Sequence, residues 1–389
     1  MTCPLPSEAW LLSWQSYHEI SYILQNVRTE KCPFYGILHK KRRISSQKCV
    51  PLHPSLNTIS IMAYTSLEIC AGAGGQALGL EMAGFDHQAL VEYESDYCTC
   101  LRQNRPHWNV MCMDVRQFDG RPYRGKIDLL SGGVPCPPFS IAGKQLGADD
   151  ERDLFPQMLR LVEEIDPKVV MIENVRGFLG KQFDSYRSSI IARLNQLGYN
   201  VHLRLMNASD YGVPQLRPRA IIIGVRTDIF DIFTFPQPMP RLTKSVGESL
   251  YDLMAANGWQ GVEQWRLMAD KIAPTLVGGS KKHGGPDLGP TRAREAWAEM
   301  GVDGRGVGNE APAADFEGMP RLTPRMMARL QGFPDEWLFS SRKTTACRMI
   351  GNAFPPPVAR EIGIKIKQVL DHASIDSRSS QEIPRRAVG

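Results

Sequence analysis

A cysteine framed by prolines is the residue of this chain best suited to nucleophilic chemistry. Cys136 follows the apolar run 127–130 and a Ser-Gly-Gly turn, and it stands between Pro135 and Pro137. Each proline fixes its own φ and favours extended geometry in the residue before it, so we expect the thiol on a stiff loop after a strand. Open α/β sheets bind ligands at the carboxyl ends of their strands. A buried structural cysteine is the alternative, and the neighbouring motifs weigh against it.

A second candidate for chemistry is an acid at the end of another apolar run. Residues 168–172 predict a strand buried on both faces, and Glu173 follows it in the sequence Glu-Asn-Val. Loss of solvent at that point favours a carboxyl group that is partly protonated. The alternative is a carboxylate that pairs with Arg176 or caps a turn.

Three polar side chains alternate along a later segment. Gln215, Arg217 and Arg219 occupy every second position, so an extended chain projects all three to the same side. Such a row suits a phosphate or the anionic edge of a substrate. An exposed edge strand would show the same alternation.

A Gly-rich turn and the strand ends that follow it predict a site for an adenosine cofactor. The run 65–70 predicts a strand that enters Ala-Gly-Ala-Gly-Gly, where glycines let the backbone approach a ligand. Strand 88–92 ends in Glu92, about 20 residues beyond the glycines, where an acid accepts from a ribose hydroxyl. Tyr93 is placed to stack on an adenine, and Asp114 to accept from its exocyclic amine. Each residue alone is commonplace, but together they outline one site.

Composition limits the class of protein. The 389 residues allow two or three domains, and a net charge of +5 permits an anionic partner without requiring one. Nine irregularly spaced cysteines include no metal-binding quartet, so we expect no metal, and reduced thiols in a cytoplasmic protein. No apolar run approaches the ~20 residues of a membrane span, and the N-terminus lacks a secretory pattern.

The order of the expected elements divides the chain into domains. We expect an α/β domain at 64–226, a smaller domain at 227–320 and a return to the first domain at 321–371. Thr323 should cap a helix within the last segment, with Pro324 at its first position.

Both ends of the chain lie outside these domains. Residues 1–63 form an N-terminal extension of unknown role, and residues 372–389 are expected to be a flexible tail. Because Met62 lies just before the first strong strand, we hypothesise that residues 1–61 are dispensable for catalysis and precede the true translation start.

The smaller domain carries a basic, glycine-rich loop. Residues 278–285 include Lys281 and Lys282, and Arg292 and Arg294 follow them. This composition suits the phosphates of a nucleic acid. A glycine-rich surface insertion is the alternative.

Taken in order, these motifs resemble those of the DNA (cytosine-5) methyltransferases over residues 65–371. The stretch 68–75 is similar to the cofactor loop of that family, with Glu68 where Asp is usual and Cys70 where an aromatic residue is usual. Pro137 stands where Gln is common. The other matches are the nucleophile motif at 135–136, the acid motif at 173–175, the Gln-x-Arg-x-Arg strand at 215–219, the segment at 321–325 and the last cofactor motif at 351–353.

The resemblance implies an α/β, Rossmann-like fold with a mixed, mostly parallel sheet that binds S-adenosylmethionine, and a smaller target-recognition domain. It places double-stranded DNA in the cleft between the two. The implied catalytic residues are Cys136, Glu173, Arg217 and Arg219. The residues expected to hold the cofactor are Cys70, Gly72, Gly74, Glu92, Tyr93, Asp114, Pro135, Leu154 and Asn352. The residues expected to contact DNA are Ser140, Gln215, Lys281, Lys282, Arg292 and Arg294.

The resemblance also implies a covalent mechanism. The Cys136 thiolate attacks C6 of a flipped-out cytosine, Glu173 shares a proton with N3 and Arg219 binds O2, so that C5 can accept a methyl group. We expect a bacterial enzyme of the restriction-modification or solitary type. It should act as a monomer, separately from any cognate endonuclease.

Three other functions stay open. A tRNA cytosine-5 methyltransferase shares these motifs but usually carries Cys-Phe-Thr in its recognition region, and this chain has no such segment there. A catalytically silent DNA-binding homologue would need none of Cys136, Glu173 and Arg219. A nicotinamide oxidoreductase would explain the Gly-rich turn but not the other motifs.

Overall fold

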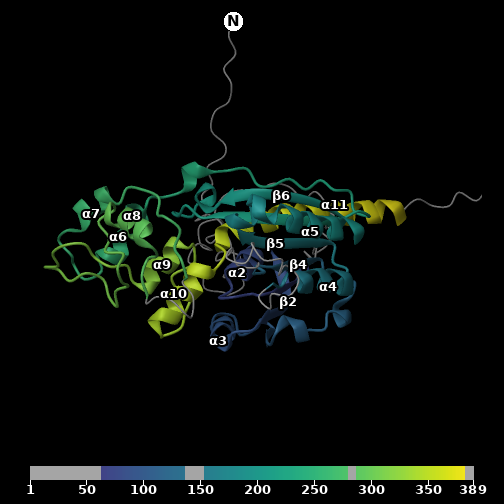
Figure 1. Cartoon of the computed structure of the whole chain (residues 1–389), viewed down its shortest axis with the longest axis horizontal. Coiled ribbons are helices and arrows are strands. Elements are labelled where there is room, and N and C mark those ends of the chain that lie inside the picture. Colours follow the sequence, from purple (N-terminus) through teal and green to yellow (C-terminus); the bar gives the residue numbers. More distant parts are fainter. Residues whose placement is uncertain (1–62, 136–152, 279–285, 382–389) are drawn as a thin grey trace, which may run out of the picture. The chain divides into compact units, whose positions relative to one another are not determined.

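A seven-stranded sheet forms the centre of the fold (Figure 1). The computed structural model describes residues 63–135, 153–278 and 286–381, with side chains up to residue 375. Ile61–Gly389 make one compact unit, and the description below concerns this unit.

The strands follow the order β3-β2-β1-β4-β5-β7-β6 across the sheet. β7 runs antiparallel to both β5 and β6, whereas the pairs from β3 to β5 are parallel. This is the mixed, mostly parallel sheet that the sequence predicts. The strands are β1 (Tyr64–Ile69), β2 (Phe85–Glu92), β3 (Val110–Cys112), β4 (Leu129–Gly132), β5 (Val169–Val175), β6 (Tyr199–Asn207) and β7 (Pro218–Arg226).

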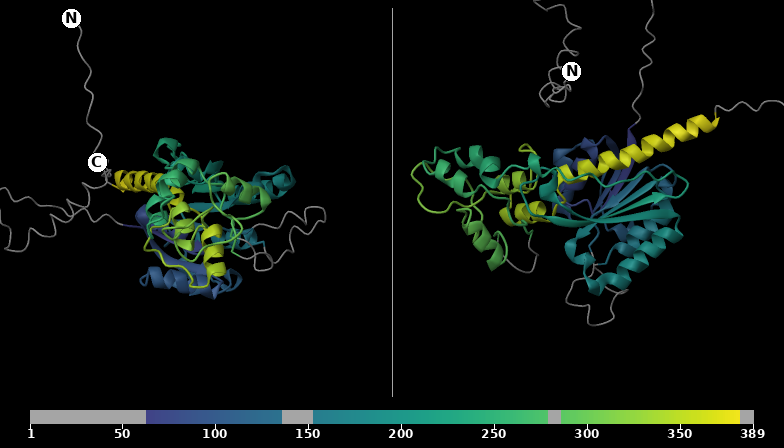
Figure 2. Two further views of the ribbon diagram at one scale, coloured as in Figure 1. Left: turned by 90° about the vertical axis from the view of Figure 1, so that its left-hand side faces the viewer. Right: turned by 90° about the horizontal axis from the view of Figure 1, so that it is seen from above.

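Helices cover both faces of this sheet. α4 (Phe155–Ile165) and α5 (Asp184–Gln196) lie on one face, and α11 (Pro356–Gln381) runs along the other with α2 (Gly75–Met82) beside it (Figure 2). Apolar residues of α4 recur every three or four positions and are buried, as an amphipathic helix requires. Apolar residues at a similar spacing on α11 are likewise buried, namely Val358, Ile362, Ile366 and Val369.

The segment expected to be a second domain shares its core with the Gly-rich turn after β1. One cluster of buried residues includes Ala71 and Leu101 together with Trp265, Trp297 and Leu322. The expected boundaries at 226 and 320 therefore stay predictions. The remaining helices are α3 (Ser95–Asn104), α6 (Val246–Met254), α7 (Val262–Met268), α8 (Thr291–Ala298), α9 (Pro324–Leu330) and α10 (Lys343–Asn352).

α9 begins where the sequence predicts a helix start. The Thr323 hydroxyl accepts from the Met326 amide at 3.3 Å, and Pro324 is the first helical residue. Gly332 follows the helix with a φ of +88°, which glycine adopts without strain.

Two elements run beyond their expected ends. β5 continues to Val175 because its ladder with β7 continues to that residue, so Glu173 lies within the strand and not after it. α11 continues to Gln381, into the segment expected to be a flexible tail. No Gly or Pro interrupts residues 372–381, so nothing removes the backbone hydrogen bonds of the helix there.

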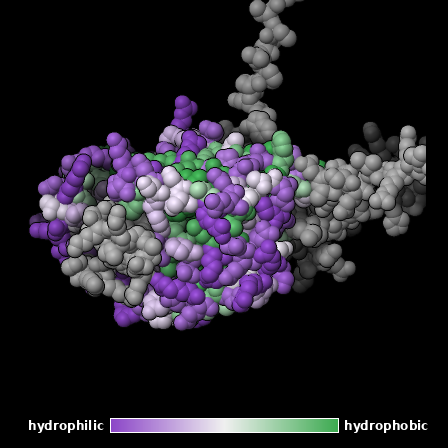
Figure 3. Space-filling model, turned by 45° about the vertical axis from the view of Figure 1, so that its right-hand side comes forward, coloured by the Kyte–Doolittle hydropathy of each residue, from purple (hydrophilic) through white to green (hydrophobic). Residues whose placement is uncertain are grey.

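Hydrophilic residues cover much of the face drawn in Figure 3, and hydrophobic residues form patches among them. Within the described ranges, no helix is both long enough and apolar enough to cross a membrane. α11 has 26 residues, but charged residues recur along it.

Gly79 of α2 permits a close contact with α11 that a methyl group would break. A Cβ at Gly79 would lie 2.3 Å from the Pro356 carbonyl oxygen and 2.5 Å from the Ala359 Cβ. Gly79→Ala should therefore lower the free energy of unfolding by about 1–3 kcal/mol, although alanine alone favours a helix by about 1 kcal/mol. Urea unfolding measures this change.

The control is Met82→Ala, at an exposed position of the same helix. It should change the free energy of unfolding by less than about 0.5 kcal/mol. A Gly79→Ala chain more stable than the parent would contradict the tight contact.

Candidate active site

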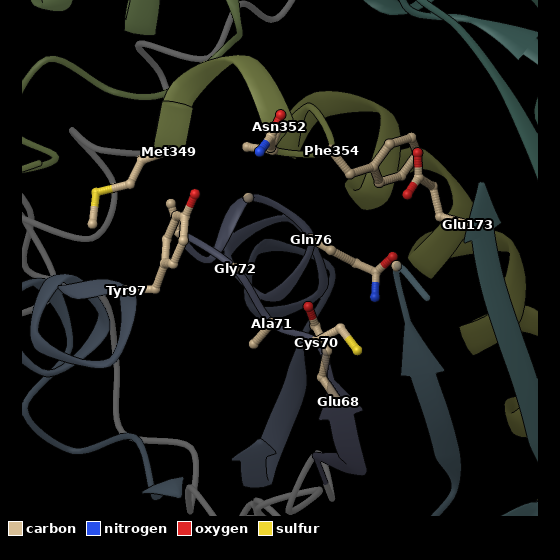
Figure 4. Close-up of a pocket in the computed structure, with 14 residues that line it drawn as sticks. Glu68, Cys70, Ala71, Gly72, Gln76, Tyr97, Glu173, Met349, Asn352 and Phe354 are labelled. Atoms are coloured by element: carbon tan, nitrogen blue, oxygen red, sulfur yellow. The ribbon is translucent and has the colours of Figure 1, made fainter. Parts of the chain in front are cut away.

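A cavity of about 200 Å³ opens at the carboxyl ends of the central strands (Figure 4). Its walls come from the end of β1 and the loop after it, the start of α2, the ends of β4 and β5, and the end of α10. In Figure 4, Tyr97 and Met349 lie across the cavity from Gln76 and Glu173. The Gly-rich turn and the acid motif, about a hundred residues apart in the chain, thus share one cavity.

Three left-handed residues shape the loop after β1. The φ angle is +54° at Cys70, +56° at Gly72 and +84° at Gly74. This geometry costs a non-glycine residue roughly 1–2 kcal/mol, so the backbone at Cys70 is strained. A cysteine in the sequence does not predict a positive φ. Burial raises the pKa of the Cys70 thiol well above its usual range. Cys70 therefore meets the cavity as a neutral side chain.

Glu92 is the expected cofactor acid that contacts the Gly-rich loop. Its two carboxylate oxygens accept from the backbone amides of Gly72, at 2.7 Å, and Glu94, at 2.8 Å. Burial raises the pKa of Glu92, and these amides oppose the rise. Tyr93 is 69% exposed, and Asp114 pairs with Arg116 at 2.9 Å. Glu92, Tyr93 and Asp114 still follow neighbouring strand ends, as the sequence predicts.

Glu173 and Arg219 form an ion pair. Arg219 Nε lies 2.7 Å from Glu173 Oε1, and both side chains are largely buried. The pair forms because β5 and β7 are neighbouring antiparallel strands, with Val175 opposite Arg219. The partner of Glu173 is therefore Arg219 and not Arg176. The Glu173 carboxyl group thus lines the cavity next to an opposite charge. The partial protonation of Glu173 that the sequence suggests stays a prediction.

The backbone that leads to Cys136 is held from two sides, although Cys136 itself lies outside the described residues. The buried Asn174 amide donates to the Val134 carbonyl oxygen at 2.9 Å. The Leu154 amide donates to the Pro135 carbonyl oxygen at 3.4 Å, which brings these two expected cofactor residues together. Sequence reasoning missed Asn174 as a positioning residue. Its place beside Glu173 in the acid motif was the available signal.

Gln215 and Arg217 are buried in the interior, and their exposed fractions are 0% and 1%. The Arg217 guanidinium donates to the carbonyl oxygens of Leu276 at 2.9 Å, Gly351 at 2.7 Å and Ala353 at 3.0 Å. Burial holds the pKa of Arg217 well below its usual range. This placement differs from the expected row of substrate contacts, because only Arg219 of the three faces the acid at the cavity.

Gln331 completes this network, and no motif in the sequence points to it. The Gln215 amide donates to Gln331 Oε1 at 2.7 Å, and the Gln331 amide donates to the Ala353 carbonyl oxygen. The Gln215 side-chain oxygen, Oε1, in turn accepts from the Leu276 backbone amide at 2.9 Å. The network joins the start of β7 to the segment before the basic loop and to the end of α10.

The remaining expected residues fall in three places. Asn352 lines the cavity at the end of α10. Arg292 and Arg294 lie on α8, Arg292 exposed and Arg294 partly buried. The residues outside the described ranges are Ser140, Lys281 and Lys282.

Replacement of Arg217 by lysine should show how much the buried guanidinium stabilises the fold. A single ammonium cannot reach all three carbonyl oxygens, so Arg217→Lys should lower the free energy of unfolding by about 2–4 kcal/mol. Chemical denaturation measures this loss. Arg292→Lys, the same change on an exposed part of α8, should stay within about 0.5 kcal/mol. Equal stability of the two variants would contradict the bridging role.

Comparisons with known proteins agree with this architecture. The family model for C-5 cytosine-specific DNA methylase matches residues 64–368. The Type II methyltransferase M.NgoMIV of Neisseria gonorrhoeae is 54% identical over 312 residues, which cover 79% of this chain and 99% of that protein. M.NaeI of Lentzea aerocolonigenes is 52% identical over 311 residues, 78% of this chain and 75% of that protein.

Solved structures resemble the fold at lower sequence identity. The Entamoeba histolytica methyltransferase EhMeth matches with a TM-score of 0.57 and 15% identity over 79% of this chain and 98% of its own. A variant of Spodoptera frugiperda DNMT2 matches with a TM-score of 0.55 and 17% identity over 79% and 99%. The family model and the close relatives together identify the activity: this chain belongs to the C-5 cytosine-specific DNA methylase family and is a DNA (cytosine-5) methyltransferase.

Proposed function

We propose that the cavity between the Gly-rich loop and Glu173 holds S-adenosylmethionine next to the target cytosine. The observation that carries this proposal is that Glu173, which is paired with Arg219, lines the same cavity as the Gly-rich loop. No other arrangement in the described part of the chain combines an acid and a base-orienting arginine with such a loop.

The residues of this cavity suit the cofactor. The backbone at Gly72 carries no side chain that would obstruct a ligand, and the Glu92 carboxylate beside it retains lone pairs for a ribose hydroxyl. Glu68 and Gln76 line the same cavity with buried polar atoms that have no partner. When bound, S-adenosylmethionine supplies an electrophilic methyl group on a positively charged sulfur. Asn352, Glu92 and the loop would hold it, with Pro135 and Leu154 near the reacting end.

Cys136 is the proposed nucleophile. Cytosine C5 is too weak a nucleophile to accept a methyl group directly, so the thiolate first adds to C6 and raises the electron density at C5. Loss of the C5 proton after methylation then expels the cysteine. Asn174 supports this step by fixing the Val134 carbonyl, which directs the backbone toward Cys136.

Glu173 and Arg219 act on the opposite edge of the base. Glu173 shares a proton with N3, which relieves the negative charge that thiolate addition places on the ring. Arg219 donates to O2 and orients both the base and Glu173, to which it is already bound. Arg217, Gln215 and Gln331 position the walls of the cavity and make no contact with the substrate in this scheme.

The substrate is proposed to be double-stranded DNA with the target cytosine flipped out of the helix. Unstacking one base costs a few kcal/mol, which phosphate contacts by Ser140, Lys281, Lys282, Arg292 and Arg294 would offset. The Type II names of the relatives support a role in restriction-modification beside a separately acting endonuclease. They also favour DNA over tRNA as substrate, and a monomeric cytoplasmic enzyme fits that role.

Replacement of the nucleophile tests the mechanism. Cys136→Ala should reduce methyl transfer to duplex DNA by more than about 10⁴-fold while S-adenosylmethionine still binds. Duplexes with 5-fluorocytosine at the target should form a covalent complex with the parent chain and none with the variant. Bisulfite sequencing of plasmid DNA from expressing cells identifies the methylated base and its site.

Two results would contradict this account. One is residual methylation of cytosine by Cys136→Ala above the level of an empty-vector control. The other is transfer of labelled methyl groups to tRNA but not to DNA by the parent chain.

The role of Glu173 gives a separate prediction. Glu173→Gln keeps the shape of the side chain but replaces the carboxyl group by an amide, which cannot transfer a proton to N3. The rate of methyl transfer should therefore fall about 10²–10⁴-fold with little change in cofactor affinity. Single-turnover kinetics measures this rate. Glu164→Gln is the control, because it breaks another partly buried ion pair, with Arg160 at 2.7 Å on α4. Equal rates for the two variants would exclude Glu173 from the chemical step.

A further inference from the structure

A buried carboxyl group that the scheme above leaves unused lies at the floor of the cavity. Glu68 is the last residue but one of β1 and is 1% exposed, and its Oε2 has no hydrogen-bond partner. Neither amide atom of Gln76 on α2 has a partner. Both residues line the cavity. Proteins seldom leave buried polar atoms unpaired, so such a group points to a ligand that completes it.

A third unpartnered group comes from the neighbouring strand. Ser131 of β4 lies opposite Glu68 in the parallel ladder, and its buried hydroxyl also has no partner. Residues opposite each other on neighbouring strands project to the same face of a sheet. The unpaired atoms of Glu68, Gln76 and Ser131 thus come from three adjoining elements, β1, α2 and β4.

The charges around Glu68 are mainly negative. Glu92 at the end of β2 and Glu173 on β5 both act on it through space and raise its pKa. Arg219 on β7 is paired with Glu173 at 2.7 Å. The Cys70 thiol is held neutral because burial raises its pKa. The described wall of the cavity therefore contributes two carboxyl groups, Glu68 and Glu173, and the arginine beside them is already paired with Glu173.

We propose that Glu68, supported by Gln76, supplies the negative charge that recognises the positively charged sulfur of S-adenosylmethionine. This inference rests on the proposed function, in which the same cavity holds that cofactor. A carboxylate excluded from water interacts strongly with a cation. After methyl transfer the sulfur is a neutral thioether, so the product loses this interaction. Glu68 would thereby favour binding of the donor over retention of the product.

Proton release should accompany donor binding. Burial, with smaller contributions from the charges of Glu92 and Glu173, raises the pKa of Glu68 to about 8. In the free protein at pH 7 the carboxyl group is therefore mostly protonated, and a cation favours its ionised form. The affinity for S-adenosylmethionine should rise as pH increases from 6.5 to 8.5, because Glu68 is then already ionised in the free protein and binding no longer has to remove its proton. The product S-adenosylhomocysteine lacks the sulfur charge and should show no such rise.

Isothermal titration calorimetry of the full-length protein tests the proposal with both compounds. Because S-adenosylmethionine and S-adenosylhomocysteine share the same amino and carboxyl groups, their affinity ratio isolates the charge on sulfur. Glu68→Gln should weaken donor binding about tenfold or more and change product binding less than about twofold. Titrations in two buffers of different ionisation enthalpy should detect proton release with the parent chain and none with the variant.

Glu163→Gln is the matched control, since Glu163 lies on α4 with 61% of its side chain exposed. It should leave both affinities and the proton release unchanged. Equal weakening of donor and product by Glu68→Gln would overturn the proposal, as would proton release that persists in that variant. If Glu68→Gln fails to fold, the titrations of the parent chain are sufficient to test the proposal. Binding of S-adenosylmethionine to the parent chain with no proton uptake or release between pH 6.5 and 8.5 would also overturn the proposal. Failure of the parent chain to bind either compound would instead refute the proposed function.

Discussion

A single buried guanidinium holds together the parts of the chain that must meet at the cavity. Arg217 has no acidic partner among its hydrogen bonds and donates to carbonyl oxygens of residues 276, 351 and 353. A buried charge without an opposite charge is costly unless its donors are satisfied. The position of these carbonyls is therefore closely constrained. One of them precedes Asn352 on the cavity wall, and Arg219 follows two residues after Arg217.

This constraint explains why the three alternating residues Gln215, Arg217 and Arg219 have two different roles. The period of two in Gln215, Arg217 and Arg219 correctly indicates extended backbone, but it says nothing of what the chain packs against. The partners of Arg217 lie 59 to 136 residues away in sequence, and Gln331 lies 116 residues from Gln215. Local pattern cannot reveal such contacts. The tertiary structure therefore assigns two of the three residues to the interior and leaves Arg219 at the cavity.

The features that the sequence predicts well are those that depend on neighbours in the chain. The Gly-rich turn and the cap at Thr323 follow from backbone geometry, and both appear in the structure. The mixed, mostly parallel sheet that the family resemblance implies is also present, although the sequence analysis specified no strand order. The strained φ of Cys70 did not follow, because cysteine is not a residue type that indicates left-handed backbone. The ion pair of Glu173 required the antiparallel placement of β7, which no local signal specifies.

The antiparallel entry of β7 also sets the electrostatics of the site. Parallel strands bring their carboxyl ends to one edge, and here β1, β2 and β5 each carry an acid near that end. β7 runs in the opposite direction, so its first residues arrive at the same edge and bring Arg219 to Glu173. The charge of Glu173 is therefore balanced, whereas Glu68 and Glu92 receive no cation from this strand. A single reversed strand thus makes the three strand-end acids electrostatically unequal. Under the proposed function, this difference separates an acid that faces a neutral base from an acid that faces a cationic methyl donor.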